Sequence, residues 1–305
     1  MSRRSWVLFA VLSAVWGASY LLIKIGLRDF APAVIVFGRT ALAALALLAL
    51  AARMGALAGL RRRLSEITVL ALVQVAGPFL LITFGERHIS SSLAGILVAT
   101  APIFTALLAI RVDHDERSHG LNLLGIVLGI AGVVLLLGVD AGGRVAALLG
   151  GLMVVLAGLG YALGGFYLKH RLSGLAPLGV SAATMSASAL LTAPFAAASL
   201  PGSAPALGPA AAVAALGLIG TGVAFWIFYT LIATEGPAKA SLVAYVAPGF
   251  AVVYGVSLLG ESFTVGTAAG LLLIVGGSWL AAEGRLPGRR RAATPGGADL
   301  AREVA

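Results

Sequence analysis

Two prolines, Pro102 and Pro248, interrupt long apolar stretches and have the clearest chemical consequence of any residues in the chain. A proline inside a helix removes one backbone hydrogen bond and crowds the preceding turn. In lipid no bulk water replaces that bond, so the freed carbonyl must be met by protein, trapped water or a ligand. Thr100 and Tyr245 bring a hydroxyl group within one turn of each proline. The pattern predicts interrupted helices at a binding site, with simple packing kinks as the alternative.

A polar and aromatic stripe runs along the first apolar stretch. Ser13, Trp16, Tyr20 and Lys24 follow one another at spacings of three and four residues, so they share one helix face. Such a face is better placed toward a cavity or another helix than toward lipid. We therefore expect Trp16 and Tyr20 to line a cavity, although Tyr20 and Lys24 also suit an anchoring role at the membrane surface.

Further candidates lie in other apolar stretches. Gln74 is near the middle of the third, where its amide needs either a neighbouring helix or a substrate as partner. Thr221 and Trp226 occupy the similar region of the eighth, and Tyr161 in the sixth corresponds to Trp16. The predicted substrate-binding residues are Trp16, Tyr20, Gln74, Thr100, Pro102, Tyr161, Thr221, Trp226, Tyr245 and Pro248.

Charged residues are almost excluded from these stretches. Arg39 is the one charge clearly inside, about two turns from a helix end, and a charge at the bilayer centre costs at least about 2.5 kcal/mol. We expect it to extend outward to water or to pair with Asp29. No carboxylate falls at mid-membrane, which argues against a simple proton antiport. The acidic residues near the stretches lie at their ends: Glu86, Glu116, Glu235 and Glu261.

The amino-acid composition indicates that the apolar stretches that carry these residues lie in a membrane. Hydrophobic residues make up 60% of the 305 residues and charged residues 11%, with a mean hydropathy of +1.02. Soluble domains carry about 25% charged residues. The apolar stretches are long and lack the alternation of barrel strands, so helices must span the membrane. The chain has no cysteine, which excludes disulfides and thiolate metal sites.

Ten spans of about 20 residues fit the chain. We read the first, which follows Arg3 and Arg4, as an uncleaved helix and not as a signal peptide. The expected spans are 5–24, 33–52, 67–86, 91–110, 121–139, 146–168, 178–199, 210–232, 239–259 and 264–282.

The basic residues predict the orientation. If the N-terminus is cytoplasmic, 16 of the 21 Lys and Arg fall on the cytoplasmic side and four on the other. Both termini are then cytoplasmic, as expected of a multi-pass protein of the cell (inner) membrane, and residues 284–305 form a disordered cytoplasmic tail. The net charge of +9 lies in short caps between apolar runs, so we expect no nucleic-acid partner.

The two halves of the chain repeat each other. Lys24 and Lys169, Pro32 and Pro177, and Glu116 and Glu261 are each 145 residues apart. Each half holds five spans, an odd number, so the second copy is expected upside down relative to the first. The fold class predicted is an all-α integral membrane protein, with ten transmembrane helices as two inverted five-helix repeats over residues 1–140 and 145–283. Such repeats are typical of secondary transporters.

At this point the residues resemble a known family. Trp16-Gly17-Ala18-Ser19-Tyr20 with Lys24, Pro32 and Arg39 resembles the opening of an EamA repeat of the drug/metabolite transporter superfamily. The Ala-Pro pairs at 101–102 and 247–248, with Glu116 and Glu261, resemble its closing half. The second copy departs from the pattern, with Thr184 in place of Arg39. The resemblance implies a ten-helix exporter or permease of small metabolites that works by alternating access.

The leading hypothesis is therefore a secondary transporter, an exporter of a small amino-acid-like or amphipathic metabolite. No G-x-x-x-x-G-K-[ST] motif is present, so ATP is not the direct driver, and no cofactor or metal is expected. One alternative is a polytopic membrane enzyme with its active site in the cytoplasmic His/Asp loop, Asp113 to His119. Under the transporter hypothesis this loop is a solvated cytoplasmic loop. The other alternative is a passive channel. Glycine pairs four residues apart, such as Gly125 and Gly129, predict either internal packing or a homodimer seam.

Overall fold

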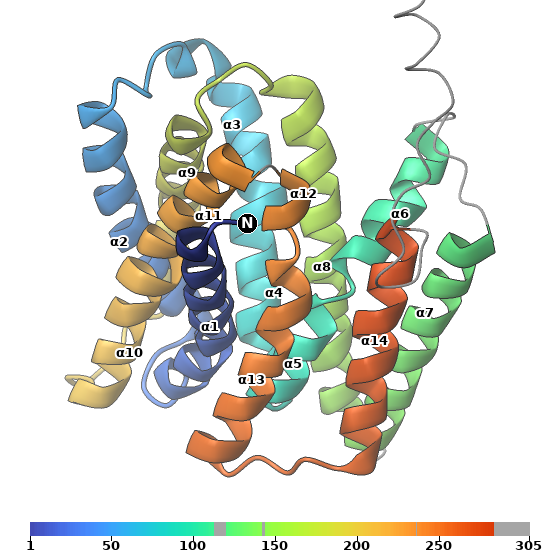
Figure 1. The fold of residues 1–305 in the computed structure, drawn as a ribbon. Helices are drawn as coiled ribbons and strands as arrows, with labels where there is room; N and C mark the ends of the chain where they lie inside the picture. The colour runs from blue at the N-terminus through green and yellow to red at the C-terminus, as the bar shows by residue number, and fades with distance from the viewer. Residues whose placement is uncertain (113–119, 142–143, 236, 284–305) are drawn as a thin grey trace, which may run out of the picture.

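The computed structural model describes residues 1–112, 120–141, 144–235 and 237–283, and every regular element in this part of the chain is helical (Figure 1). Nine of its helices are long and apolar enough to cross a membrane, and a tenth, Val243–Leu259, is shorter. These helices correspond to the ten expected spans. The expected tail 284–305 and the loop 113–119 lie outside the described residues.

Sequence signals account for several of the helix boundaries. Ser2 precedes α1 (Arg3–Gly26), and its hydroxyl accepts a hydrogen bond from the Ser5 amide, which caps the helix. Pro32 and Pro177 begin α2 (Pro32–Arg53) and α9 (Pro177–Ala197), where the missing N–H costs nothing. Gly260 ends α13 (Val243–Leu259) with a φ of 66°, which requires a residue without a Cβ.

The fourth and ninth spans are both interrupted. In the fourth, α5 (Ser91–Val98) ends before Ala99 and Thr100, and Pro102 is the second residue of α6 (Ala101–Val112). In the ninth, the short α12 (Pro237–Ala240) is separated from α13 by Ser241 and Leu242. Pro248 lies inside α13, so the break in that span comes before the proline and not at it.

The third and eighth spans each contain one widened, π-helical turn. The third consists of η1 (Leu60–Arg63), α3 (Leu64–Leu70), the π-turn η2 (Ala71–Ala76) and α4 (Gly77–Gly85). The eighth consists of α10 (Leu207–Gly217), the π-turn η3 (Leu218–Val223) and α11 (Ala224–Glu235). Gln74 and Thr221 are each the fourth residue of their turn. Such turns are frequent at functional sites.

The helices pack in pairs that take one member from each half of the chain. The helix α2 packs against α9, and α7 (Gly120–Ala141) against α14 (Val265–Glu283). The first span α1 packs on the ninth and eighth, as the sixth span α8 (Val145–Arg171) packs on the fourth and third (Figure 1). Equivalent spans of the two halves therefore have equivalent neighbours.

Glycines allow these helices to approach closely. A Cβ on Gly125 of α7 would lie 2.6 Å from the Gly277 carbonyl of α14, and a Cβ on Gly85 would lie 2.6 Å from the Gly150 carbonyl of α8. A Cβ on Gly160 would lie 2.8 Å from the ring of Pro78. The glycine pair members Gly125 and Gly160 thus serve contacts within one chain.

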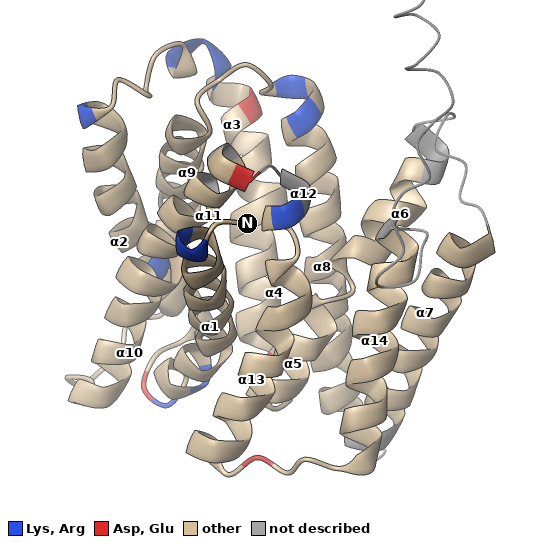
Figure 2. Ribbon diagram, viewed as in Figure 1, with Lys and Arg blue, Asp and Glu red and all other residues tan. Residues whose placement is uncertain are grey.

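Apart from Arg39 inside α2, the charged residues that the structure describes lie near the two ends of the bundle. Figure 2 shows Lys and Arg gathered at the upper end, on the α2–α3 connection and at the end of α8, with an almost uncharged belt below. This belt is the part suited to lipid, and it makes the chain a multi-pass membrane protein together with its nine long apolar helices. Which end faces the cytoplasm stays a prediction.

Candidate functional site

Arg39 lies inside the bundle and does not extend to water. Its side chain is 6% exposed, and its Nε and Nη2 donate to the Thr221 hydroxyl at 3.3 and 3.1 Å. The guanidinium carbon is 3.7 Å from the centre of the Phe79 ring. The expectation of pairing with Asp29 is therefore wrong, because Asp29 instead accepts from the Ala206 amide at 2.7 Å. A hydroxyl and an aromatic face replace the water that Arg39 gives up.

Four further groups interact with this arginine, and we call the five residues the central cluster. Tyr20 of α1 interacts electrostatically with Tyr161 of α8, with Glu86 at the end of α4 and with Arg39. Thr221 completes the set through its bonds to Arg39. The cluster thus combines residues from both halves of the chain: Tyr20, Arg39, Glu86, Tyr161 and Thr221.

A cavity of about 450 Å³ lies beside Glu86 at the end of the bundle that we expect to face away from the cytoplasm. Lys24 projects into this end of the molecule, and its ammonium donates to the Ile89 carbonyl at 2.7 Å and to the backbone carbonyl of Glu86. Three cations and two carboxyl groups line the cavity. Its lining consists of Lys24, Leu27, Arg28, Glu86, Arg87, Leu259 and Glu261.

Glu261 in this cavity caps the first turn of α5. Its two oxygens accept from the Ser91 and Ser92 amides at 2.7 and 2.9 Å and from both serine hydroxyls. Burial alone would raise the pKa of Glu261, but the bonds from Ser92 and Ser91 outweigh it and hold the pKa below the usual glutamate range. The contact ties the α13–α14 connection to the first half of the chain.

A second carboxylate joins the halves at the opposite end. Glu235 of α11 accepts from the Ser2 amide at 3.1 Å and from Lys239 at 2.9 Å, and it lies 3.6 Å from the amino terminus. Hydrogen bonds from Ser5, Lys239 and Ser2 lower the pKa of Glu235 to about 2. The start of α1 is thereby fixed to the end of α11.

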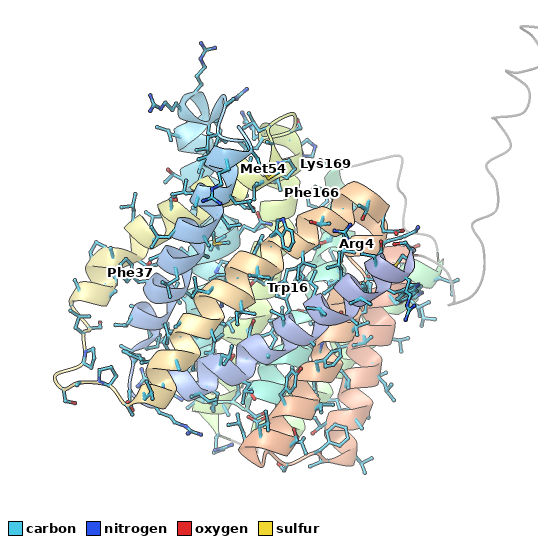
Figure 3. The ribbon with its side chains drawn as sticks, turned by 60° about the vertical axis from the view of Figure 1, so that its left-hand side comes forward. Arg4, Trp16, Phe37, Met54, Phe166 and Lys169 are labelled. Atoms are coloured by element: carbon cyan, nitrogen blue, oxygen red, sulfur yellow. The ribbon has the colours of Figure 1, made fainter. Side chains whose placement is uncertain are left out.

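Three of the ten predicted binding residues fall in the central cluster: Tyr20, Tyr161 and Thr221. Trp16 lies nearby on α1 and points toward α11 (Figure 3), where its ring centre is 5.2 Å from that of Phe228. Trp226, on α11, is 45% exposed and faces away from the core. The indole of Trp16 therefore belongs to the packing between α1 and α11.

The remaining predicted residues are spread over other contacts. Gln74 lies against α8, close enough that a Cβ on Gly164 would meet its side chain. The Thr100 hydroxyl donates to the Leu97 carbonyl at 2.7 Å, and Tyr245 stacks edge-on against Trp279 at 5.6 Å. Pro102 and Pro248 mark the α5–α6 break and the interior of α13. None of the ten lines the cavity beside Glu86.

Sequence reasoning missed two members of the cluster, Arg39 and Glu86. The charge of Arg39 inside a span was a signal of an internal site, because membrane-buried charges are usually functional. Glu86 gave no such signal, since a carboxylate at a helix end is ordinary and only the packed structure shows it to be 0% exposed.

Comparisons with known proteins agree with this architecture. A crystal structure of 19% sequence identity has the same fold with a TM-score of 0.66, covering 92% of this chain and 98% of its own. An uncharacterized inner membrane transporter, YedA, of Escherichia coli K12 is 30% identical over 271 residues, 86% of each chain.

Two other relatives carry names that specify a cargo. A probable terminal-alkyne amino-acid exporter of Streptantibioticus cattleyicolor is 29% identical over 97% of this chain and 99% of its own. A probable amino-acid metabolite efflux pump of Escherichia coli is 30% identical over 57% of this chain and 56% of its own.

The family comparison matches the chain twice. The model of the EamA-like transporter family covers residues 4–138 and again residues 148–282, which is most of both halves. The family and these relatives are named as transporters, exporters or efflux pumps. The chain, a membrane transporter by these criteria, belongs to the EamA-like transporter family.

Proposed function

We propose that this protein is a secondary transporter that exports a small amino-acid-like metabolite by alternating access between two inverted five-helix repeats, residues 1–140 and 145–283. The observation that carries the proposal is a buried polar cluster assembled from both halves, centred on the Arg39–Thr221 contact. A site shared by two halves is opened to either side when one half rocks against the other.

The arrangement of the helices supports the two-repeat reading. The family model matches once in each half, and equivalent spans have equivalent neighbours and equivalent π-turns. Carboxylate ties at both ends of the bundle join the halves and are suited to closing one end at a time. Cytoplasmic termini, proposed from the distribution of Lys and Arg, make the cavity beside Glu86 the outer one.

The central cluster favours a substrate that carries a carboxylate. A buried guanidinium offers several N–H donors to a carboxylate, and the Tyr20 and Tyr161 hydroxyls add further polar contacts. An amino acid or a derivative of one fits this chemistry, and two relatives are named for such cargo. Trp16 and Gln74 extend the proposed site toward apolar substituents of an amphipathic compound.

Counterflow in proteoliposomes tests the proposal. Vesicles loaded with unlabelled amino acids are expected to accumulate labelled amino acids in a saturable manner, and vesicles loaded with sugars are not. Flux that never saturates indicates the channel alternative. Absence of counterflow from every loaded pool, with protein that is folded and inserted, overturns the proposal.

A further inference from the structure

The carboxyl group of Glu86 is placed where a negative charge is poorly supported. Its side chain is 0% exposed, and neither oxygen has a hydrogen-bond partner within the described part of the chain. It also follows the last residue of α4, so the negative end of the helix dipole lies beside it. A carboxylate removed from water without replacement donors favours its neutral form. These surroundings favour the protonated form of the Glu86 carboxyl group.

Glu261 lines the same cavity in the opposite surroundings. Four donors at the start of α5 stabilise its negative charge, whereas the carboxyl group of Glu86 has no such donors in the described part of the chain. The negative charge of Glu261 acts on Glu86 and opposes a second charge there. The two carboxyl groups of this cavity therefore differ in how well their surroundings stabilise a negative charge. Such a difference is typical of sites in which one carboxyl group acts as an acid and the other as a base.

Charged and titratable groups on the neighbouring helices and connections also interact with Glu86. Two cations, Lys24 and Arg39, favour its ionised form and so keep proton release within reach. The helix α8 packs against the preceding residue, Gly85, at Gly150 and Val154. The groups that interact electrostatically with Glu86 are Tyr20 and Lys24 from α1, Arg39 from α2 and Glu261 from the α13–α14 connection. Two further cations, Arg28 and Arg87, line the same cavity.

We propose that Glu86 is the proton-binding residue of an exchange in which one proton enters for each substrate exported. Its carboxyl group holds a proton in one half of the cycle and the ammonium group of the substrate in the other, while Arg39 holds the carboxylate. The cavity lined by Lys24 and Glu261 gives Glu86 its route to the outer solution. This inference rests on the proposed export of amino-acid-like compounds.

The exchange needs no bond other than O–H to form or break. A proton from the outer solution binds Glu86 and displaces the ammonium group, so the substrate leaves. When the next substrate arrives from the cytoplasm, Glu86 gives that proton to cytoplasmic water and takes the new ammonium group. A carboxyl at the end of a helix serves this purpose as well as one at mid-membrane, provided that it is dry.

Infrared difference spectroscopy tests the proton site without any substrate. The purified full-length protein, reconstituted in liposomes, is titrated with pH alone, and the C=O stretching band of protonated carboxyl groups is followed. We expect a band that persists above the pH range of ordinary glutamates and is missing in Glu86→Gln. The matched control is Glu66→Gln, a partly exposed glutamate in the first turn of α3 that is bound to Arg63, which should leave the band unchanged.

Glu261→Gln and Glu86→Asp complete the series. Removing the charge of Glu261 should move the disappearance of the band to lower pH, because a like charge no longer opposes ionisation of Glu86. Glu86→Asp should keep a shifted band. A band that survives in folded Glu86→Gln protein overturns the assignment, and so does a wild-type protein with no such band.

Transport by the same variants separates this inference from the proposed function. Labelled amino acids are the probe, driven either by counterflow or by an imposed pH difference. Glu86→Gln should slow counterflow, because the ammonium group of the substrate loses its carboxylate, and the counterflow that remains should no longer respond to the imposed pH difference. Equal pH-driven accumulation in Glu86→Gln and wild type overturns the coupling role. If no amino acid moves in any variant but the band depends on Glu86, the export proposal fails and the proton site stands.

Discussion

At the scale of single residues, the energetics of the bundle centre depend on how Arg39 is solvated by protein. A buried guanidinium remains charged, so each donor that loses water must find an acceptor or an aromatic face. Thr221 accepts two of its N–H groups and Phe79 covers its plane. The Thr221 hydroxyl donates in turn to the Leu216 carbonyl at 3.0 Å, which orients its lone pairs toward the arginine. The Thr221 hydroxyl therefore accepts from Arg39 and donates to Leu216.

Thr221→Val removes this acceptor while conserving the shape of the side chain. We expect the free energy of unfolding to fall by about 1.5–3 kcal/mol, because a charged donor loses its partner in the interior. Thermal unfolding in detergent measures the change. The control is Thr230→Val in the same span, whose hydroxyl donates to the Trp226 carbonyl of its own helix. Similar losses in both variants would mean that the Arg39 contact contributes nothing particular.

Arg39→Lys keeps the charge but loses the planar fork that binds Thr221 and stacks on Phe79. An ammonium cannot stack in the same way or reach both contacts, so this exchange is not conservative. If Arg39 holds the substrate carboxylate, counterflow of labelled amino acids should slow more than about tenfold, the factor that corresponds to about 1.4 kcal/mol. Thr184→Ser, at the equivalent place of the second half, is the control. Unimpaired counterflow in Arg39→Lys would remove Arg39 from the binding site.

At the scale of elements, the close contact between α4 and α8 fixes the position of Glu86. The chain passes directly from Gly85 at the end of α4 to Glu86, and Gly85 meets Gly150 of α8 so closely that neither position has room for a Cβ. A Cβ on Gly150 would lie 2.8 Å from the Gly85 carbonyl. Backbone cannot yield as a flexible side chain does, so any larger residue must separate the helices.

Gly150→Ala should therefore destabilise the protein, whereas Gly165→Ala in the same helix should not. Nothing lies within 4 Å of a Cβ at Gly165, so alanine there should gain up to about 1 kcal/mol from its higher helix propensity. Overpacking at Gly150 is expected to cost about 1–3 kcal/mol. Melting temperatures of the two variants should shift in opposite directions. Equal shifts would show that the α4–α8 contact tolerates a methyl group.

The positions of the spans can be predicted from the lengths of the apolar stretches, whereas the buried site depends on how the helices pack. The ten spans follow from hydropathy, since residues such as Pro32 and Gly260 mark helix ends by their own backbone preferences. The break at Pro102 was predictable, whereas the break before Pro248 was not, because it depends on how α12 and α13 pack. The π-turns leave no local signal at all. Glu86 joins the candidate site only through burial by neighbours distant in sequence.

At the scale of the whole molecule, two carboxylate ties hold the halves together at opposite ends. Glu235 fixes the start of α1, and Glu261 fixes the start of α5. The pKa of Glu261 is lowered in the folded protein, so the stability it adds is present at neutral pH and is lost only as pH falls through that lowered value. The tie should survive mild acid.

The free energy of unfolding measured at several pH values tests whether the contribution of Glu261 is lost only in acid. Wild type and Glu261→Gln should differ by a constant amount from neutral pH down to the ordinary glutamate range of about 4.3, and the difference should shrink only below it. Thermal unfolding at a series of pH values provides the measurement, with Glu66→Gln as the partly exposed control. A difference that already disappears near neutral pH would contradict the hydrogen-bonded, ionised state of Glu261.

Alternating access requires these ties to open in turn, so fixing one of them should stop transport. The chain has no cysteine, and Ser92→Cys with Glu261→Cys therefore supplies the only two thiols. A short bifunctional methanethiosulfonate reagent should join them and abolish amino-acid counterflow, and dithiothreitol should restore it. Each single-cysteine variant treated with the same reagent is the control for modification alone. Because one end would be permanently closed, neither direction of exchange should remain. Full counterflow in the cross-linked protein would mean that the α5 contact with the α13–α14 connection stays closed throughout the cycle and belongs to the rigid frame.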